Sequence, residues 1–229
     1  MPLDNELRHD LPAMHAALSP QTRAVYVCNP NNPTGTAVSA VRLREFVRAL
    51  PDHVLTIVDE AYMDFATDPA VGTVRDLVQE RRVVILRTFS KIHGMAGLRC
   101  GYAVAPPNII AALSAARMSS PNIFAVRAAR ASLHDQAFLS SCRRRILASR
   151  ERITEELTRL KRRYADPQGN FVFFDTGMPL GRFSELMLQR RILVGRHFAP
   201  YDSWCRITVG TEAEVHRFLR RLREISAAA

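Results

Sequence analysis

The sequence has little lysine, no two cysteines at CxxC spacing and no long apolar run. A transmembrane helix needs about 18 or more consecutive apolar residues, and the absence of such a run predicts no membrane span. Pro2, Leu3 and Asp4 follow Met1 without the basic start or the apolar core of a secretory signal peptide. We therefore expect a cytoplasmic protein that has no membrane partner.

The four cysteines form no CxxC pair, and no histidine cluster lies at the spacing of metal ligands. Isolated cysteines of this kind are usually buried, reduced thiols of a cytoplasmic protein. The sequence therefore predicts neither a disulfide nor a metal site for Cys28, Cys100, Cys142 and Cys205.

The formal net charge of +10 comes from a set of 32 basic residues in which only Lys91 and Lys161 are lysines. So strong a preference for arginine indicates a coding bias at least as much as a nucleic-acid ligand. Each lysine therefore needs its own explanation, because an amine can form a Schiff base and a guanidinium cannot.

The chain of 229 residues is 47% hydrophobic and 24% charged, which is a globular composition and excludes disordered and low-complexity classes. Up to about residue 120, apolar runs that predict strands alternate with helical patterns. This order favours an α/β fold with a mostly parallel sheet and helices on both faces. The predicted elements are strands 24–28, 54–58, 83–86 and 100–105 and a helix over 39–50 that Ser39 would cap.

The pattern changes after Pro121, where helices predominate and then give way to a smaller α+β unit. Apolar residues at three- and four-residue steps from Leu139 to Tyr164 predict a long amphipathic helix. We expect three parts, namely a large domain over 1–120, connecting helices over 121–165 and a small domain over 166–229. The other predicted elements are helices 123–133, 183–190 and 212–225 and strands 171–175, 192–194 and 205–209.

The long helix carries many basic residues, which have two interpretations. One is a nucleic-acid surface, and the other is a solvated face with the ion pairs Arg152–Glu156 and Glu155–Arg159. Neither interleaved aromatic residues nor a binding motif accompanies the charges, so we expect no nucleic-acid partner. The basic residues are Arg143, Arg144, Arg145, Arg150, Arg152, Arg159, Lys161, Arg162 and Arg163.

Unusual polar motifs follow three predicted strands at the point where each strand ends. These are NPNNPTG at 29–35, DEAY at 59–62 and TFSK at 88–91, and the last continues into GMAGLRCGY at 94–102. Taken singly, they fit a turn, a helix start and a surface lysine. Ligands of open α/β sheets bind beyond the carboxyl ends of the strands, so the three motifs together indicate one site.

On these motifs the sequence resembles the class I/II aminotransferases, which are fold-type I enzymes that depend on pyridoxal 5′-phosphate (PLP). It is most similar to histidinol-phosphate aminotransferases. The resemblance extends from Pro2 to Thr211 and is more specific for the superfamily than for the substrate. It implies a partial fold-type I large domain followed by a small C-terminal α+β domain.

The resemblance implies a PLP site. Lys91 matches the lysine that forms a Schiff base with the cofactor and then transfers protons. Asp59 matches the carboxylate that keeps the pyridine nitrogen protonated. Asn32 and Tyr62 match the residues that bind the phenolic oxygen of the ring. The hydroxyls of Thr88 and Ser90 and the guanidinium of Arg99 would bind the cofactor phosphate.

The resemblance also implies a substrate-binding end. Arg206, in the segment CRITVGT, matches a small-domain arginine that binds the anionic end of the substrate. Arg196 matches a second anion-binding arginine of histidinol-phosphate-type sequences, and Asn170 falls where the family has an asparagine near the substrate. For Arg196 and Asn170, a structural hydrogen bond stays open as the alternative role.

The family has a large stretch before the position of Met1. It supplies sheet strands, phosphate-binding backbone donors, an aromatic residue that stacks on the ring and a tyrosine that reaches the partner subunit's site. None of these is recognisable here, which fits a fragment, a misplaced start or one half of a split protein. We expect four strands in one block with two unpaired edges, and a chain that is poorly active or inactive alone.

The implied reaction is transamination from histidinol phosphate or an aromatic amino acid to 2-oxoglutarate, as in histidine biosynthesis, and the full-length family is normally homodimeric. Two alternatives stay open. One is a fold-type I lyase or decarboxylase that uses the same lysine, and the other is a truncated, non-catalytic fragment.

Overall fold

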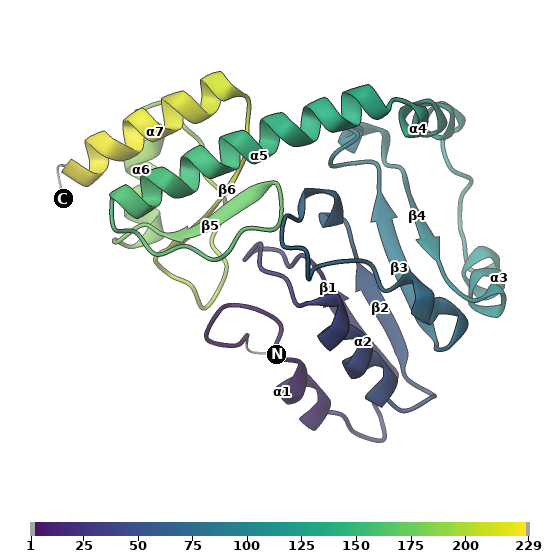
Figure 1. Cartoon of the computed structure of the whole chain (residues 1–229). Coiled ribbons are helices and arrows are strands. Elements are labelled where there is room, and N and C mark those ends of the chain that lie inside the picture. Colours follow the sequence, from purple (N-terminus) through teal and green to yellow (C-terminus); the bar gives the residue numbers. More distant parts are fainter. Residues whose placement is uncertain (1–2, 228–229) are drawn as a thin grey trace.

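The computed structural model describes residues 3–227, and it contains two β-sheets joined by a long helix (Figure 1). In the larger sheet, β1 and β2 are parallel, as are β2 and β3, whereas β4 is antiparallel to β3. The fold is therefore α/β with a mostly parallel sheet. The strands of this sheet, in spatial order, are β1 (Ala24–Cys28), β2 (Leu55–Asp59), β3 (Val83–Thr88) and β4 (Gly101–Val104).

One face of the larger sheet is closed by short helices. The helix α2 (Ala40–Ala49) begins after Ser39, whose side chain accepts a hydrogen bond from the N–H of Arg42, as the sequence predicts. The helix α1 (Leu11–Ala16) and the 3₁₀ helix η2 (Arg75–Gln79) lie beside it. The apolar core formed with the sheet includes Leu11, Val25, Val27, Leu43, Phe46, Val58, Leu77 and Ile85.

The opposite face of the larger sheet is more open, since Tyr26 on β1 is 51% exposed there. Within residues 3–227, β1 and β4 each pair with a single neighbour, so both edges of the sheet lack a partner strand. The structure thus agrees with the prediction of one four-stranded block with two unpaired edges.

Three helices lead from the larger sheet to the smaller one, and the last of them runs along both (Figure 1). The first, α3 (Pro107–Ala115), has no buried residue, and α4 (Ile123–His134) buries only Ala125 and Ala129. The third, α5 (Gln136–Arg159), contacts both the 3₁₀ helix η1 (Met63–Phe65) and the smaller sheet.

Two arginines of α5 point into the protein. Arg150 is buried and donates to the carbonyl oxygens of Phe65 (3.1 Å) and Gly169 (2.9 Å). Arg143 donates to the carbonyl oxygens of Asp64 (2.9 Å) and Ala66 (2.7 Å). The expectation of a solvated face is therefore wrong for these two residues.

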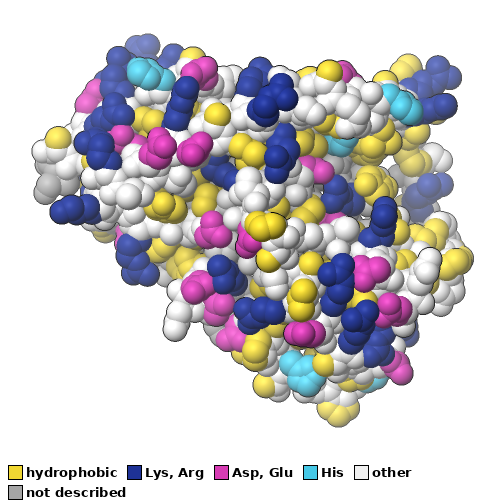
Figure 2. Space-filling model, in the orientation of Figure 1, with side chains coloured by type: hydrophobic (Ala, Val, Ile, Leu, Met, Phe, Trp, Pro, Cys, Tyr) yellow, Lys and Arg dark blue, Asp and Glu magenta, His cyan; other side chains and the backbone are white. Residues whose placement is uncertain are grey.

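The two ion pairs predicted within α5 are also wrong in their partners. Arg152 pairs with Glu212 at the start of α7 (Glu212–Ala227), and Arg159 pairs with Glu156 three residues before it. Figure 2 shows the other basic side chains of this side of the molecule spread out and interspersed with acidic ones.

The smaller sheet consists of β5 (Phe171–Asp175) and β6 (Trp204–Thr208), which are antiparallel. The helices α6 (Leu180–Gln189) and α7 (Glu212–Ala227) form with α5 a second core. Its fully buried members include Ile153, Leu157, Phe174, Phe183 and Met187.

The strand predicted over 192–194 is wrong, since no ladder forms there within the described residues. Ile192 and Val194 pack on the second core, which explains their apolar character, but Leu193 between them is 85% exposed. The left-handed backbone of Arg191 (φ 61°) turns the chain just before this segment.

All four cysteines are free thiols, but the expectation of burial holds only for Cys28 and Cys205. Cys100 and Cys142 are partly exposed. Among the helices of residues 3–227, none combines the length and the apolar character that crossing a membrane requires.

Candidate active site

The lysine of the TFSK motif lies beside the tyrosine of the DEAY motif. At the end of β3, the Thr88 hydroxyl oxygen accepts the N–H of Ser90 (3.0 Å), and this turn leads into Lys91. The Lys91 Nζ atom lies 5.0 Å from the centroid of the buried Tyr62 ring. Since β2 and β3 are parallel neighbours, their carboxyl ends bring the two motifs to one edge of the sheet.

A chain of contacts continues from Tyr62 to the smaller sheet. The Tyr62 ring meets the Phe171 ring edge-on at 5.0 Å, and the Arg206 guanidinium lies 4.9 Å from the centroid of Phe171. The Arg206 Nη1 atom also donates to the Asn32 side-chain oxygen at 2.8 Å. The structure thus brings together Lys91, Tyr62, Arg206 and Asn32, which lie up to 174 positions apart in the sequence.

Asp59 ends β2 directly opposite Cys28 of β1. One carboxylate oxygen accepts the N–H of Ala61 (2.9 Å), and the other accepts the hydroxyl of Tyr26 (2.6 Å). Burial and the Asp59 carboxylate raise the pKa of the Cys28 thiol to about 12, so the thiol stays neutral at pH 7. Burial together with the bond to Asp59 raises the pKa of Tyr26 as well.

The three residues predicted to bind phosphate lie on adjoining segments. The Phe89 N–H donates to the Cys100 carbonyl oxygen (3.1 Å), which holds the loop that contains Thr88 and Ser90 beside Arg99. Arg99 has a left-handed backbone (φ 53°), and its guanidinium donates to the Ala96 carbonyl oxygen (2.7 Å). No hydrogen bond within residues 3–227 joins Arg99 to either hydroxyl.

Arg196 and Asn170 lie at the small-sheet side of the cluster. The Arg196 guanidinium lies 4.9 Å from the centroid of the Phe198 ring, and Arg206 lies 5.7 Å from the same centroid. The two arginines therefore share one aromatic side chain. The Asn170 backbone carbonyl accepts the N–H of Val209 (2.9 Å), a main-chain bond that leaves the role of its side chain a prediction.

Sequence reasoning missed three aromatic residues that connect the cluster, namely Tyr26, Phe171 and Phe198. Phe171 begins a strand in which four consecutive residues are buried, so its apolar character is explained by the core alone. Tyr26 falls within the predicted strand 24–28, and its partner becomes visible only when β1 and β2 are placed in register.

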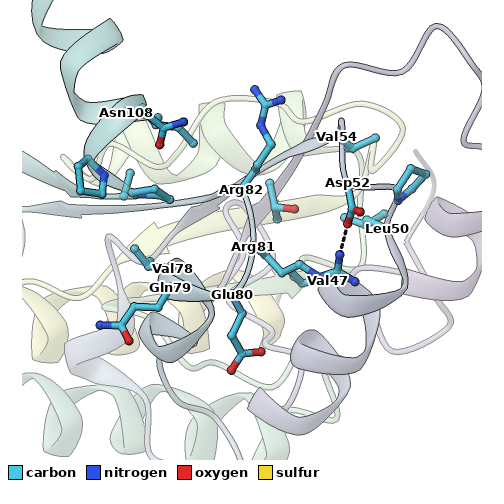
Figure 3. Close-up of a pocket in the computed structure, with 16 residues that line it drawn as sticks. Val47, Leu50, Asp52, Val54, Val78, Gln79, Glu80, Arg81, Arg82 and Asn108 are labelled. Atoms are coloured by element: carbon cyan, nitrogen blue, oxygen red, sulfur yellow. Dashed lines mark hydrogen bonds and ion pairs between the residues drawn. The ribbon is translucent and has the colours of Figure 1, made fainter.

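A cavity of about 630 Å³ lies at the opposite end of the larger sheet (Figure 3). Its wall includes the paired Asp52 and Arg81 together with Arg82 and Asn108, and it contains none of the predicted site residues. A second cavity, of about 590 Å³, lies against β6 and includes Arg206. Within residues 3–227, His, Cys, Asp and Glu do not gather in groups of three or more that could hold a metal ion.

The arrangement has a clear chemical capacity. It places a primary amine against an aromatic ring, a carboxylate at the next strand end, and a guanidinium whose Nε atom is buried without a hydrogen-bond partner among the described residues. An amine of this kind can attack a carbonyl carbon, and the guanidinium can hold a carboxylate or phosphate.

Comparisons with known proteins agree with this chemistry. The model of the family "Aminotransferase class I and II" matches residues 1–222. A histidinol-phosphate aminotransferase of Moorella thermoacetica is 41% identical over 96% of this chain and 58% of its own length. An aromatic amino acid aminotransferase of Rhodococcus jostii is 39% identical over 96% of this chain and 60% of its own length.

The solved histidinol-phosphate aminotransferase of Sinorhizobium meliloti, in complex with pyridoxal-5′-phosphate, superposes with a TM-score of 0.88 at 30% identity. The superposition covers 100% of this chain and 64% of that one. The predicted architecture, a partial fold-type I large domain with a small α+β unit, is thus confirmed. The chain spans about three fifths of the length of the curated relatives named above. It belongs to the aminotransferase class I and II family.

Proposed function

We propose that this chain carries the lysine-bearing part of a PLP-dependent aminotransferase site. The amino donor would be histidinol phosphate or an aromatic amino acid, as the names of the relatives suggest, and the acceptor 2-oxoglutarate. The observation that carries the proposal is the continuous contact from the Lys91 amine through Tyr62 and Phe171 to the Arg206 guanidinium.

The side chains present fit the chemistry of PLP. The Lys91 amine suits its aldehyde, the Asp59 carboxylate suits its ring nitrogen, and Tyr62 and Asn32 suit its ring oxygen. Bound PLP would supply an electron sink that makes the α-proton of the amino donor acidic. The cofactor phosphate would be held by Thr88, Ser90 and Arg99.

The chain's own residues would then perform three tasks. Lys91 Nζ would take the proton from the α-carbon of the substrate and return it, as a general base and then a general acid. Arg206 would bind and orient the substrate carboxylate through its guanidinium, whose Nη1 atom lies on the exposed side. Arg196, which shares the Phe198 ring with Arg206, would hold a second anionic group such as a phosphate.

Separate cores for the two sheets support the division into parts at 1–120, 121–165 and 166–229, which stays a prediction. A homodimer of the full-length protein is proposed only from the resemblance. Because the chain spans about three fifths of its relatives, we expect it to bind PLP but to turn over poorly.

Cofactor binding by the purified chain tests the proposal. Added PLP should give a shifted visible absorbance band that is abolished in Lys91→Ala and kept in Lys161→Ala, which removes the other lysine of the sequence. Histidinol phosphate, phenylalanine and tyrosine are then compared for their ability to bleach the band. A band that persists in Lys91→Ala, or no PLP binding by the wild-type chain, would refute the proposal.

A further inference from the structure

The carboxylate of Asp59 is held by one backbone donor and one side-chain donor. Its Oδ1 atom accepts the N–H of Ala61 (2.9 Å) within the turn that follows β2. Its Oδ2 atom accepts the hydroxyl of Tyr26 at 2.6 Å, the shorter of the two bonds. These are the hydrogen bonds that residues 3–227 make to this carboxylate, so Tyr26 alone among the side chains fixes its orientation.

The register of the parallel strands makes this contact possible. Cys28 lies opposite Asp59, and Tyr26 lies opposite Ile57, two residues earlier on each strand. Side chains two positions apart point to the same face of a sheet, so Tyr26 and Asp59 are diagonal neighbours on the open face. A long side chain is needed to span that diagonal, and tyrosine provides one with a donor at its tip.

The two donors that hold the Asp59 carboxylate, the Ala61 N–H and the Tyr26 hydroxyl, are both neutral groups. Cys28 interacts electrostatically with both residues, and its thiol is neutral at pH 7 and donates to the Pro30 carbonyl oxygen (3.2 Å). Tyr26 is neutral as well. Neither neighbour therefore adds a positive charge that would compete with a cation placed against Asp59.

We propose that Tyr26 is a positioning residue that orients the Asp59 carboxylate toward the ring nitrogen of the cofactor. This inference rests on the function proposed above. A neutral donor to one carboxylate oxygen holds the group in place without adding a positive charge that would compete with a protonated ring nitrogen. An arginine at this position would instead have neutralised the charge on which that proton depends.

The test compares PLP with an analogue in which a C–H group replaces the ring nitrogen, because only PLP can use a correctly oriented Asp59. Tyr26→Phe keeps the ring and removes the hydroxyl. We expect it to weaken PLP binding about tenfold, the effect of losing a hydrogen bond to a charged group, and to leave analogue binding unchanged.

Two further variants make the result specific. Tyr164→Phe removes the hydroxyl of another exposed tyrosine (37% against 51%), which lies outside the site and contacts the Thr158 hydroxyl at 3.2 Å, and both affinities should stay at the wild-type value. When Tyr26→Phe is added to Asp59→Asn, the affinity for PLP should fall no further than in Asp59→Asn alone, because Tyr26 acts through the Asp59 carboxylate. Thermal unfolding of each variant identifies any general loss of structure.

The outcomes separate this inference from the proposed function. A Tyr26→Phe chain that binds PLP as tightly as wild type, or that loses affinity for PLP and the analogue equally, refutes the role of Tyr26 while leaving the function of Lys91 intact. A wild-type chain that binds neither compound refutes the proposed function, and the role of Tyr26 is refuted with it.

Discussion

Arg206 makes two kinds of contact that prepare a guanidinium for an anion. It lies over the Phe171 and Phe198 rings, which restricts its conformations and favours the cation. Its Nη1 atom is bound to Asn32, while its buried Nε atom has no partner within the described residues. The guanidinium is thus held in place over two rings by a neutral partner, so its charge would be available to an arriving carboxylate or phosphate.

Replacement of this guanidinium should weaken anion binding. We expect Arg206→Met, which keeps an apolar stem against the rings, to reduce the affinity for 2-oxoglutarate at least about tenfold, because a charge-assisted bond is lost. Isothermal titration calorimetry measures this affinity. Arg163→Met is the matched control, since Arg163 also lies over an aromatic ring, that of Trp204, at 5.9 Å. Equal losses in both variants would exclude a specific anion site at Arg206.

Among the elements, α5 is held to α7 through a buried carboxylate, that of Glu156, which binds two partly exposed arginines. Glu156, which is 5% exposed, accepts hydrogen bonds from Arg223 of α7 (2.7 Å) and from Arg159 (3.1 Å). These bonds lower the pKa of the Glu156 carboxyl from its ordinary 4.5 to about 2, and the bond from Arg223 has the largest effect.

The contribution of Glu156 to stability should therefore depend on pH. Its pKa is lower in the folded than in the unfolded state, so its contribution is complete above about 4.5 and is lost as the pH falls from 4.5 to about 2. Glu156→Gln should cost about 1 to 2 kcal/mol at pH 7 and should make stability less sensitive to acid in this window. Urea unfolding at several pH values measures both effects. The exposed neighbour Glu155→Gln should change neither, and an unaltered acid sensitivity of Glu156→Gln would contradict the assignment.

Arg150 connects the same helix to η1 and to the segment that precedes β5. Its guanidinium satisfies the carbonyl oxygens of Phe65 and Gly169, and burial lowers its pKa to about 10, so it stays charged at pH 7. Arg150→Met should cost about 3 kcal/mol in the free energy of unfolding, because two buried carbonyls lose their donor. Arg145→Met, at an exposed position of α5, should cost less than about 0.5 kcal/mol. Similar unfolding midpoints for both variants would contradict this role.

Sequence patterns predict elements better than they predict partners. The strands β1 to β4 and the cap at Ser39 follow from local apolar runs and one side-chain oxygen, and both are observed. The helix α1 has only six residues, and α3 is apolar without a buried face, so neither has a periodic pattern to recognise. The inward orientation of Arg150 and the contact of Tyr26 with Asp59 depend on packing and register, which spacing in one sequence does not contain.

The same limit applied to the candidate site. The motifs at the strand ends place Lys91, Asp59 and Tyr62 near one another, because parallel strands end at a common edge. Their connection to Arg206 passes through Phe171 on β5, which is on the other sheet. Only the packing of the two sheets around this phenylalanine brings the arginine to the lysine.

For the molecule as a whole, the larger sheet has two unpaired edges and one open face, and the helices beside it expose apolar side chains. On α4 and the segment before it, Phe124 is 76% exposed, Ile123 is 59% exposed and Met118 is 101% exposed. Exposed apolar side chains and free strand edges both favour association with other chains. The isolated chain should therefore self-associate as its concentration rises.

If apolar contacts drive this association, it should depend on the exposed side chains of α4 and not on those of the smaller unit. We expect Phe124→Ser to shift sedimentation-velocity profiles toward the monomer at a given concentration, since it removes the largest exposed side chain of α4. Leu193→Ser, which alters a side chain that is 85% exposed on the smaller unit, should leave the profiles unchanged. If both substitutions reduce association equally, general surface hydrophobicity is responsible. If neither does, the unpaired edges of β1 and β4 account for the association, because backbone pairing does not require these side chains.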